Sequence, residues 1–227
     1  MITETHLDNN ILDAEVNIPG YNLIRADRSK RKHGGVCIYI EEYLPYETLT
    51  SWSNSVCEIC AIKSLETVLV CLYRPPDCKH HELLEMTTVL KNILEDNDYC
   101  DIILAGDFNF PSIKWVCEDP PTFEPMDCSL IPQARHLIYL LQDNFMSQYV
   151  NESTRKDNIL DLIFTNNENL VQKVVIKNTN LSDHDIIEVS STRLLNKPKV
   201  ESRKDYYGFN ALNFRSEKIK WGAIKKD

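Results

Sequence analysis

The sequence predicts an α/β sandwich, in which helices pack on mixed β-sheets around one hydrophobic core. Three observations favour this fold class: short apolar runs typical of strands occur along most of the chain, two longer stretches have the amphipathic spacing of helices, and the connections include both hairpins and crossovers. The length of 227 residues fits one large domain or two small ones, and a hydrophobic content of 43% is ordinary for a globular protein.

Four strands are predicted in the first third of the chain. Residues 21–25 form a short strand, and a basic loop ending at Gly34-Gly35 connects it to a second strand at residues 36–40. Residues 57–63 and 67–73 are apolar runs separated by three residues, so they are predicted to form a β-hairpin.

The hydrophobic period changes after this hairpin. Residues 81–95 place apolar side chains on one stripe of a helix, at Leu83, Leu84, Val89, Leu90, Ile93 and Leu94. Residues 101–105 are continuously apolar, as expected of a strand that is buried on both faces. A proline-rich loop at residues 111–125 precedes a second helix at residues 133–143, whose inward positions are Leu137, Leu140 and Leu141.

Three more strands are predicted at residues 160–164, 171–176 and 186–190, and residues 197–227 are predicted to lie outside the domain. This last segment has nine basic and four acidic residues, a charge of +5, whereas the whole chain carries −9, so the part before it carries −14. An acidic body binds nucleic acid poorly through charge alone, because such binding depends on Lys and Arg. Clustered carboxylates can nevertheless hold a divalent cation that cleaves phosphodiesters.

The sequence contains no apolar run approaching the roughly 20 residues that a membrane span needs, and no signal peptide is recognised. Eight cysteines without such a signal predict reduced thiols in an intracellular protein. Cys57-Glu58-Ile59-Cys60 is the one CxxC pair. In a strand, residues three apart point to opposite faces, so these two cysteines are predicted not to share a metal ion.

Polar residues that could take part in catalysis or metal binding follow the predicted strand ends. Asp107 and Asn109 come directly after the apolar run at residues 101–105, and in extended chain they would project from the same face. A carboxylate beside an amide can hold and aim a water molecule or a metal ion. The structural alternative is an Asx turn that closes the strand.

A histidine and a carboxylate form the second candidate site. Asp161 lies within an apolar run, where a charge is costly unless it is paired. His184 lies between Asp183 and Asp185, just before a predicted strand. A neighbouring carboxylate raises the basicity of a histidine and fixes its tautomer, so we predict that Asp161 and His184 lie within hydrogen-bonding distance. For His184 the alternative is a solvated loop with ordinary local pairing, and His80-His81 is predicted to be a solvated helix start.

Six segments match a known set of motifs, in the same order along the chain: Thr3-Glu4-Thr5-His6-Leu7 (SETWL-type), Gly34-Gly35-Val36 to Ile40 (GGVAIYI-type), Tyr73-Arg74-Pro75-Pro76 (YRPP), Gly106-Asp107-Phe108-Asn109 through Trp115 (GDFNxPxIxW), Thr154-Arg155 through Asn166 (TRxxNxLDLxxTN) and Ser182-Asp183-His184 (SDH). Over residues 2–191 the chain resembles the endonuclease/exonuclease/phosphatase family, which has the DNase I-like fold. Within that family it looks most like the endonuclease domain of jockey- and CR1-type non-LTR retrotransposons. Each motif is weak alone, but six in order are specific.

The resemblance implies a four-layer α/β sandwich, with two packed mixed β-sheets flanked by helices. It also implies hydrolysis of a DNA phosphodiester, which leaves a nick that can prime reverse transcription. By this resemblance, Glu4 and Asp183 would bind Mg²⁺ or Mn²⁺, and Asp107 and Asn109 would position and activate the attacking water. Asp161 would orient His184, and His184 and Tyr73 would interact with the scissile phosphate. Thr154 and Ser182 would make supporting contacts.

The chain departs from the family pattern at its start. In the family, a strand that carries an Asn metal ligand precedes the Glu, whereas Met1 stands three residues before Glu4, so this strand and its Asn are expected to be absent. His6 replaces a Trp that is more usual in the family. We expect residues 1–192 to form the domain, incomplete at its N-terminus, and residues 193–227 to form a basic linker of the kind that leads to a reverse transcriptase domain.

Double-stranded DNA is the expected partner, with no membrane involved. The basic loop is predicted to contact DNA phosphates through Arg25, Arg28, Lys30, Arg31 and Lys32. The location would be the nucleus if the substrate is genomic DNA. Two alternatives stay open at this point: a phosphatase or phosphodiesterase acting on another substrate, and a catalytically silent remnant of the same fold.

Overall fold

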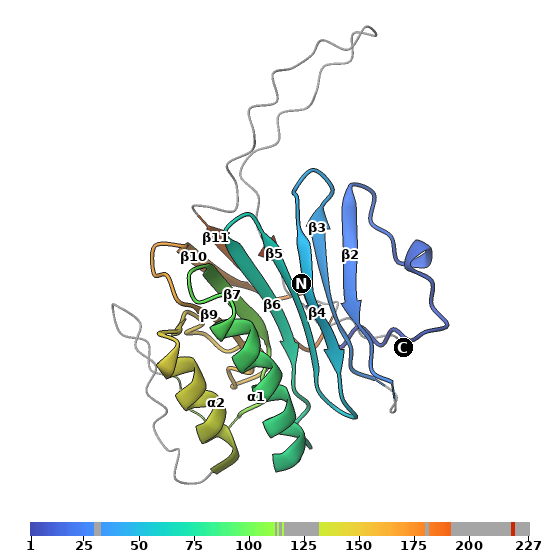
Figure 1. Ribbon diagram of the computed structural model, residues 1–227. Coiled ribbons are helices and arrows are strands. Elements are labelled where there is room, and N and C mark those ends of the chain that lie inside the picture. The colour runs from blue at the N-terminus through green and yellow to red at the C-terminus, as the bar shows by residue number, and fades with distance from the viewer. Residues whose placement is uncertain are drawn as a thin grey trace, which may run out of the picture.

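The structure is a computed structural model that describes residues 1–29, 33–111, 113, 115, 132–179, 182–191 and 219–220. Figure 1 shows two helices lying side by side over one face of a large sheet, with the strands of the N-terminal segment beyond the sheet. None of the helices in these ranges is long and apolar enough to cross a membrane.

A six-stranded mixed sheet forms the centre of the molecule. Its strands lie in the order β4 (Glu47–Ser53), β5 (Glu58–Ser64), β6 (Thr67–Tyr73), β7 (Asp101–Asp107), β9 (Asp161–Thr165) and β8 (Ser147–Gln148). β6 and β7 are parallel, and the other neighbouring pairs are antiparallel. β6 and β7 occupy the middle because their residues are almost all apolar and can be buried on both faces.

Two helices cover one face of this sheet. α1 (His80–Glu95) is the crossover between the parallel strands β6 and β7, and α2 (Pro132–Asp143) packs beside α1 (Figure 1). The helices and the sheet share a core to which α1 contributes Leu83, Met86, Leu90 and Leu94, α2 contributes Leu137 and Leu141, and the sheet contributes Val68, Val70, Leu72 and Leu104. Burial of this apolar stripe is what holds α1 on the sheet.

The other face of the central sheet packs against two small antiparallel sheets. One has the order β1 (Ile2–Thr3), β3 (Val36–Glu41) and β2 (Tyr21–Ala26), and the other has the order β10 (Val171–Lys177), β11 (Ile186–Ser191) and β12 (Ile219–Lys220). Alternate residues of the central strands face this second core, where Leu69, Cys71, Ile103 and Ala105 meet Ile38 and Val189.

The α/β fold class, both helices and all eight predicted strands are confirmed, with ends that differ by at most two residues from the predicted ones. Four strands were not predicted. β1, β8 and β12 have two residues each, too few to show a period, and β4 is a largely exposed edge strand with a polar sequence. β12 belongs to the C-terminal segment, and its two residues pair with β11.

The described part of the chain shows three layers in place of the expected four: the two helices, the central sheet, and the two small sheets together. Its helices longer than one turn, α1 and α2, both lie on the same side. The predicted proline-rich loop falls mostly outside the described residues.

Gly106 is required by the close packing of β7 on β6. A Cβ atom at this position would lie 1.8 Å from the carbonyl oxygen of Leu72, so even alanine would force the two strands apart. Gly106 and Leu72 are register partners, and the next pair along the two strands is Tyr73 and Asp107. The glycine therefore lets these two strand ends lie side by side.

Arg28 forms a buried ion pair and not an exposed contact. Its Nε donates to Glu58 Oε1 at 2.6 Å and its Nη2 donates to Glu58 Oε2 at 3.1 Å and to the carbonyl of Val56. The guanidinium lies against Gly34, where a Cβ atom would come within 2.3 Å of it. The predicted DNA contact is therefore corrected for Arg28, because its charge is already used inside the protein. Lys30, Arg31 and Lys32 lie outside the described residues.

Arg25, the remaining member of the predicted DNA-contacting set, is also engaged. Its Nε pairs with Asp13 and Asp27, each at 3.2 Å, and its Nη2 donates to the carbonyl of Ile11 at 2.8 Å. These contacts give Arg25 a structural role at the start of the basic loop.

The Arg28–Glu58 pair yields a stability prediction. Arg28→Met should lower the free energy of unfolding by about 3–5 kcal/mol, because it leaves the carboxylate of Glu58 buried without its partner. Urea unfolding followed by circular dichroism measures the change. Lys91→Met is the control: it breaks an exposed pair with Glu95 on α1 and should cost about 0.5 kcal/mol or less. Equal effects of the two substitutions would contradict the assignment of Arg28 as a buried structural charge.

Candidate active site

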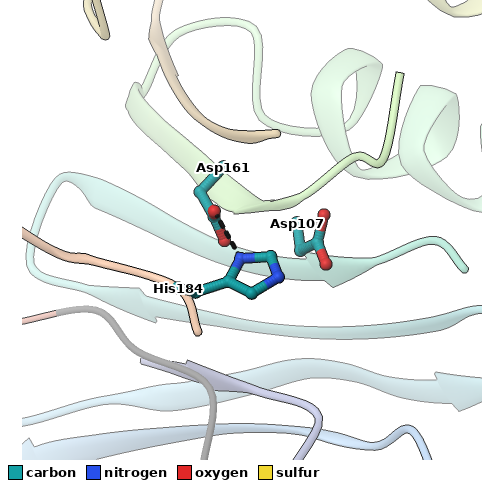
Figure 2. Close-up of side chains that lie close together, drawn as sticks. All are labelled: Asp107, Asp161 and His184. Carbon is teal, nitrogen blue, oxygen red and sulfur yellow. Dashed lines mark hydrogen bonds and ion pairs between the residues drawn. The ribbon is translucent and has the colours of Figure 1, made fainter. Parts of the chain in front are cut away.

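Strand ends bring three chemically active side chains together. β7 ends at Asp107 and β9 begins at Asp161, and these two residues are register partners. His184 lies just before β11, and Figure 2 shows its imidazole next to Asp161 and facing Asp107. One ligand atom from each of these three residues lies within 4.8 Å of the other two.

Asp161 and His184 form the predicted hydrogen-bonded pair. His184 Nδ1 lies 2.7 Å from Asp161 Oδ2, which confirms the contact (Figure 2). Burial by itself lowers the pKa of His184, but the hydrogen bond and negative charge of Asp161 outweigh burial and raise this pKa above its ordinary value. The imidazole therefore holds its proton more strongly than a free histidine does.

Thr154 and Ser182 fix the backbone around this pair. Thr154 Oγ1 accepts hydrogen bonds from the N–H groups of Leu160 and Asp161, both at 3.1 Å, and thereby sets the start of β9. Ser182 Oγ accepts from the N–H of His184 at 3.1 Å. The N–H of Asp185 donates to the carbonyl of Thr154 at 2.8 Å, which ties the two loops together. These contacts place both residues where a supporting role was predicted.

Asp107 and Asn109 meet through a turn and not through extended chain. Asn109 has a φ of +50°, and its N–H donates to Asp107 Oδ1 at 3.0 Å, which is the Asx turn considered as the alternative. Its side chain also donates from Nδ2 to Asp107 Oδ2 at 2.7 Å. The Asx turn therefore brings the Asn109 amide next to the Asp107 carboxylate, and both of the arrangements considered from the sequence occur together.

Arg74 holds this turn, although the sequence analysis assigned it no role. Its Nη1 donates to the carbonyls of Phe108 and Asn109 at 3.2 and 2.9 Å, and its own carbonyl accepts from Asn109 Nδ2 at 3.0 Å. The guanidinium stacks over the ring of Phe110. The signal was present in the Tyr73-Arg74-Pro75-Pro76 motif, where a charged residue follows a fully buried strand.

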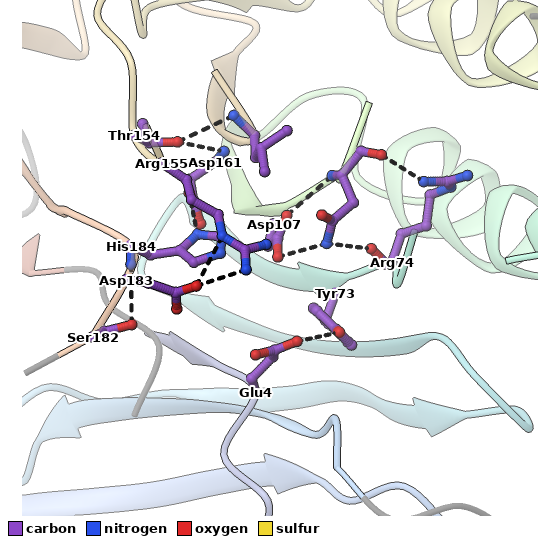
Figure 3. A network of polar contacts seen from close by, with 12 residues as sticks. Glu4, Tyr73, Arg74, Asp107, Thr154, Arg155, Asp161, Ser182, Asp183 and His184 are labelled. Carbon is purple, nitrogen blue, oxygen red and sulfur yellow. Dashed lines mark hydrogen bonds and ion pairs between the residues drawn. The ribbon is translucent and has the colours of Figure 1, made fainter. Parts of the chain in front are cut away.

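Glu4 reaches the site from the opposite sheet. Its carboxylate accepts a hydrogen bond from the hydroxyl of Tyr73 (Figure 3). The N–H groups of Thr5 and His6 donate to the carbonyls of Gly35 and Gly34, which fixes the chain just after Glu4. Burial first, and then Glu4, raise the pKa of Tyr73, so its phenol stays neutral and remains a donor.

Asp183 lies at the exposed margin of the site. Its Oδ2 accepts from Arg155 Nε at 3.0 Å and from Arg155 Nη2 at 2.6 Å (Figure 3). Arg155 is the second residue that the sequence analysis did not single out, even though it belongs to a motif quoted for the resemblance. Figure 3 shows Glu4, Asp107, Asp183 and His184 in one region, and Asn109 is hydrogen-bonded to Asp107 there.

The donors gathered here fit a hard divalent cation. Carboxylate and amide oxygens are the ligands that Mg²⁺ and Mn²⁺ prefer. Burial, followed by the charges of Asp161 and Glu4, raises the pKa of Asp107 well above its ordinary value. The negative groups thus repel one another, and a bound cation would relieve that repulsion.

Charge crowding at Asp107 predicts a gain in stability on neutralisation. A carboxyl whose pKa is raised on folding favours the folded state when protonated, and this benefit is lost as the pH rises. Asp107→Asn should therefore be more stable than the wild type at pH 8 in EDTA, and the difference should shrink toward pH 4. Chemical unfolding across this pH range measures it. A variant that is less stable at every pH would contradict the crowding.

The Asp161–His184 pair predicts a shifted titration. Asp161→Asn should lower the pKa of His184, because burial remains while the stabilising anion is lost. NMR titration of the imidazole signals measures this change, and the exposed His81 serves as an internal reference. The raised pKa of His184 stabilises the fold fully below about pH 6.5, and this contribution disappears as the pH rises through the folded value. The loss of stability caused by Asp161→Asn should therefore be greatest at low pH and should decrease as the pH rises. A titration of His184 that Asp161→Asn leaves unchanged would exclude the Asp161–His184 hydrogen bond.

Several solved structures resemble this chain in fold. The endonuclease domain of TRAS1, a telomere-specific non-LTR retrotransposon, is similar in structure, with a TM-score of 0.52 and 12% identity over 79% of this chain and 83% of that one. An AP endonuclease from Archaeoglobus fulgidus gives a TM-score of 0.56 at 11% identity, over 81% of this chain and 84% of that one. The 3′ phosphatase NExo from Neisseria, bound to product DNA hairpin, gives 0.55 at 11% identity, over 84% and 87% of the two chains. At these identities the likeness establishes the fold.

A search of curated proteins gives no match. The family model described as endonuclease-reverse transcriptase matches residues 67–188, more than half of the chain. This segment runs from β6 to β11 and contains Tyr73, Asp107, Asn109, Asp161 and His184. The chain therefore belongs to the endonuclease-reverse transcriptase family, with the DNase I-like fold of nucleases and phosphatases.

Proposed function

We propose that this chain is a divalent-metal-dependent DNA endonuclease domain of retrotransposon origin, which nicks double-stranded DNA by hydrolysing a phosphodiester. The observation that carries the proposal is that Asp107, Asp161 and His184 each have a ligand atom within 4.8 Å of those of the other two, at the ends of β7 and β9. Family membership supports hydrolase chemistry, and the likeness to a retrotransposon endonuclease supports DNA as the substrate.

Asp107 and Asn109 are proposed to position and activate the attacking water. The raised pKa of Asp107 suits a group that accepts a proton, because a more basic carboxylate takes the proton of water more readily. Asn109 donates two hydrogen bonds to this carboxylate and so fixes where its oxygens point. Arg74 Nη1 donates a hydrogen bond to the carbonyl of Asn109 and so helps to fix the same turn.

His184 is proposed to stabilise the charge that develops on the scissile phosphate. Its raised pKa keeps the imidazole protonated at higher pH than usual, and a buried cationic donor next to a developing oxyanion gives a large electrostatic effect. Asp161 orients the ring through Nδ1. The neutral phenol of Tyr73 would donate a further hydrogen bond to the phosphate.

Glu4 is the proposed ligand for Mg²⁺ or Mn²⁺, next to the carboxylate of Asp107. When bound, the cation supplies Lewis-acid stabilisation of the phosphate. Asp183 was expected to be a ligand, but its carboxylate is held by Arg155, so a supporting role fits the contacts better. A reverse transcriptase domain downstream, and action in the nucleus on genomic DNA, belong to this same proposal.

Phosphatase activity is the second candidate. One similar structure is a 3′ phosphatase bound to product DNA hairpin, and its fold is shared with this chain. Removal of a terminal phosphate and cleavage within a strand use the same in-line chemistry, so the two functions differ in which phosphates can enter the site.

Supercoiled plasmid incubated with the protein and Mg²⁺ tests the proposal. The wild type should convert it to open circles, and EDTA should abolish this conversion. His184→Ala and Asp107→Ala should each reduce the rate by at least about 100-fold, because each removes a group that acts on the reacting atoms. His81→Ala, at the exposed start of α1, is the matched control and should leave the rate unchanged.

The alternative functions give different outcomes. Release of phosphate from a 3′-phosphorylated oligonucleotide without nicking would replace the proposal with the phosphatase. Metal-dependent hydrolysis of a lipid or sugar phosphate alone would move the substrate outside nucleic acids. Inactivity on all of these, in a protein that gains thermal stability from Mg²⁺, would identify a silent remnant that keeps its metal site.

A further inference from the structure

Two buried thiols that play no part in the proposed nuclease chemistry contact each other. Cys57 lies immediately before β5, and Cys78 lies in the connection between β6 and α1. Their Sγ atoms are 3.4 Å apart. A disulfide needs an S–S distance of about 2.05 Å, so the two sulfurs are in contact and would have to move closer to bond.

The sequence analysis treated Cys57 only as part of a CxxC pair with Cys60. The structure confirms that these two do not share a site, because Cys57 belongs to the core under the helices and Cys60 belongs to the core on the opposite face of the sheet. The partner of Cys57 comes from a distant part of the sequence, 21 residues away. Spacing in the sequence could not reveal it.

The two thiols are chemically unequal. The hydrogen bond between the two thiols lowers the pKa of Cys78 against the effect of burial, and the nearby Arg74 guanidinium lowers it further. That same hydrogen bond and burial raise the pKa of Cys57. Cys78, the thiol beside the Arg74 guanidinium, is therefore expected to react first, and Cys57 lies in contact with it and can react afterwards.

Other described cysteines lack this combination. Cys71 and Cys60 are register partners on β6 and β5, but burial raises the pKa of Cys71 to about 12 and raises that of Cys60 further. Burial likewise raises the pKa of Cys37 to about 11. Neither thiol of the Cys60–Cys71 pair has a lowered pKa, so neither is activated to attack a peroxide, and proximity alone does not make this pair reactive.

We propose that Cys57 and Cys78 are a redox modification site, at which a hydroperoxide converts the two thiols to a disulfide. The Cys78 thiolate attacks one peroxide oxygen, the O–O bond breaks, and the product is a Cys78 sulfenic acid with release of water or an alcohol. The Cys57 sulfur then attacks the Cys78 sulfur, and the hydroxyl group leaves as water with the proton of the Cys57 thiol. Two thiols lose two electrons and two protons in total, and one peroxide is reduced.

The bond would fasten the Arg74-bearing connection to the start of β5. Arg74 precedes Cys78 by four residues and holds the Asn109 turn, while Glu58, next to Cys57, pairs with the buried Arg28. Cys78 is 5% exposed and its chain neighbours Asp77 and Lys79 are exposed, so this side of the thiol pair is the one from which we expect a small peroxide to approach. The modification would thus lie four residues from Arg74, which holds the Asn109 turn, and it would use none of the proposed metal ligands.

Peptide mapping of the full-length chain tests the proposal. The reduced protein is treated with hydrogen peroxide, remaining thiols are blocked with N-ethylmaleimide, and the digest is analysed by mass spectrometry without reduction. A linked peptide pair containing Cys57 and Cys78 should appear and should be lost on treatment with dithiothreitol. Because closing a loop of this length restricts the unfolded chain, the oxidised wild type should melt roughly 5–10 °C higher than the reduced one.

Three variants make the result specific. Cys57→Ser should leave a sulfenic acid on Cys78 that dimedone traps, Cys78→Ser should form no linked peptide, and Cys71→Ser should form the same link as the wild type. Alkylation of both Cys57 and Cys78 after a peroxide dose that oxidises free cysteine would overturn the proposal, as would a link that joins either of them to another cysteine. A fall in melting temperature on oxidation would also overturn it, because the sulfurs would then have to leave their packed positions to bond. The wild-type map needs no variant to fold and is independent of nuclease activity.

Discussion

The register of three neighbouring strands is the constraint on which the site depends. Tyr73 pairs with Asp107 across β6 and β7, and Asp107 pairs with Asp161 across β7 and β9. A phenol and two carboxylates are therefore aligned at the neighbouring ends of these three strands. A shift of one residue in either pairing would turn alternate side chains to the opposite face. Gly106 permits this register, since its missing side chain is where the Leu72 carbonyl lies.

The same alignment creates an electrostatic cost. Burial and neighbouring carboxylates disfavour the ionised form of Asp107, and few positive groups compensate within the cluster: His184 is engaged by Asp161, and Arg155 is engaged by Asp183. Such crowding is typical of functional sites, because carboxylates gathered to bind a cation or to transfer a proton repel one another when no cation or proton is bound. The nearby ion pair of Arg28 and Glu58 is different, since each charge there is satisfied by the other.

Residues outside the reacting set keep this arrangement in place. Arg74 holds the Asn109 turn, Thr154 sets the first residues of β9, and Arg155 holds Asp183 beside His184. Each of these residues connects loops that are distant in the sequence. If the site works as proposed, its loops are therefore ordered by hydrogen bonds before the substrate arrives, and little reorganisation remains to be done during the reaction. The thiol pair of Cys57 and Cys78 lies at the edge of the same network, which makes the Arg74 connection a place where chemistry outside the site could act on it.

The sequence by itself determined the helices, eight of the nine strands longer than two residues, and the family, because hydrophobic periodicity and short motifs are local properties of the sequence. It also predicted the contact of Asp161 with His184, since a charge within an apolar strand must find a partner. Only the tertiary structure decided that Arg28 is buried against Glu58, that Asp183 is held by Arg155, that Asn109 meets Asp107 through a turn, and that Cys57 faces Cys78. Each of these depends on which distant segments pack together and on the burial that results, and neither quantity is encoded in the spacing of residues along the chain.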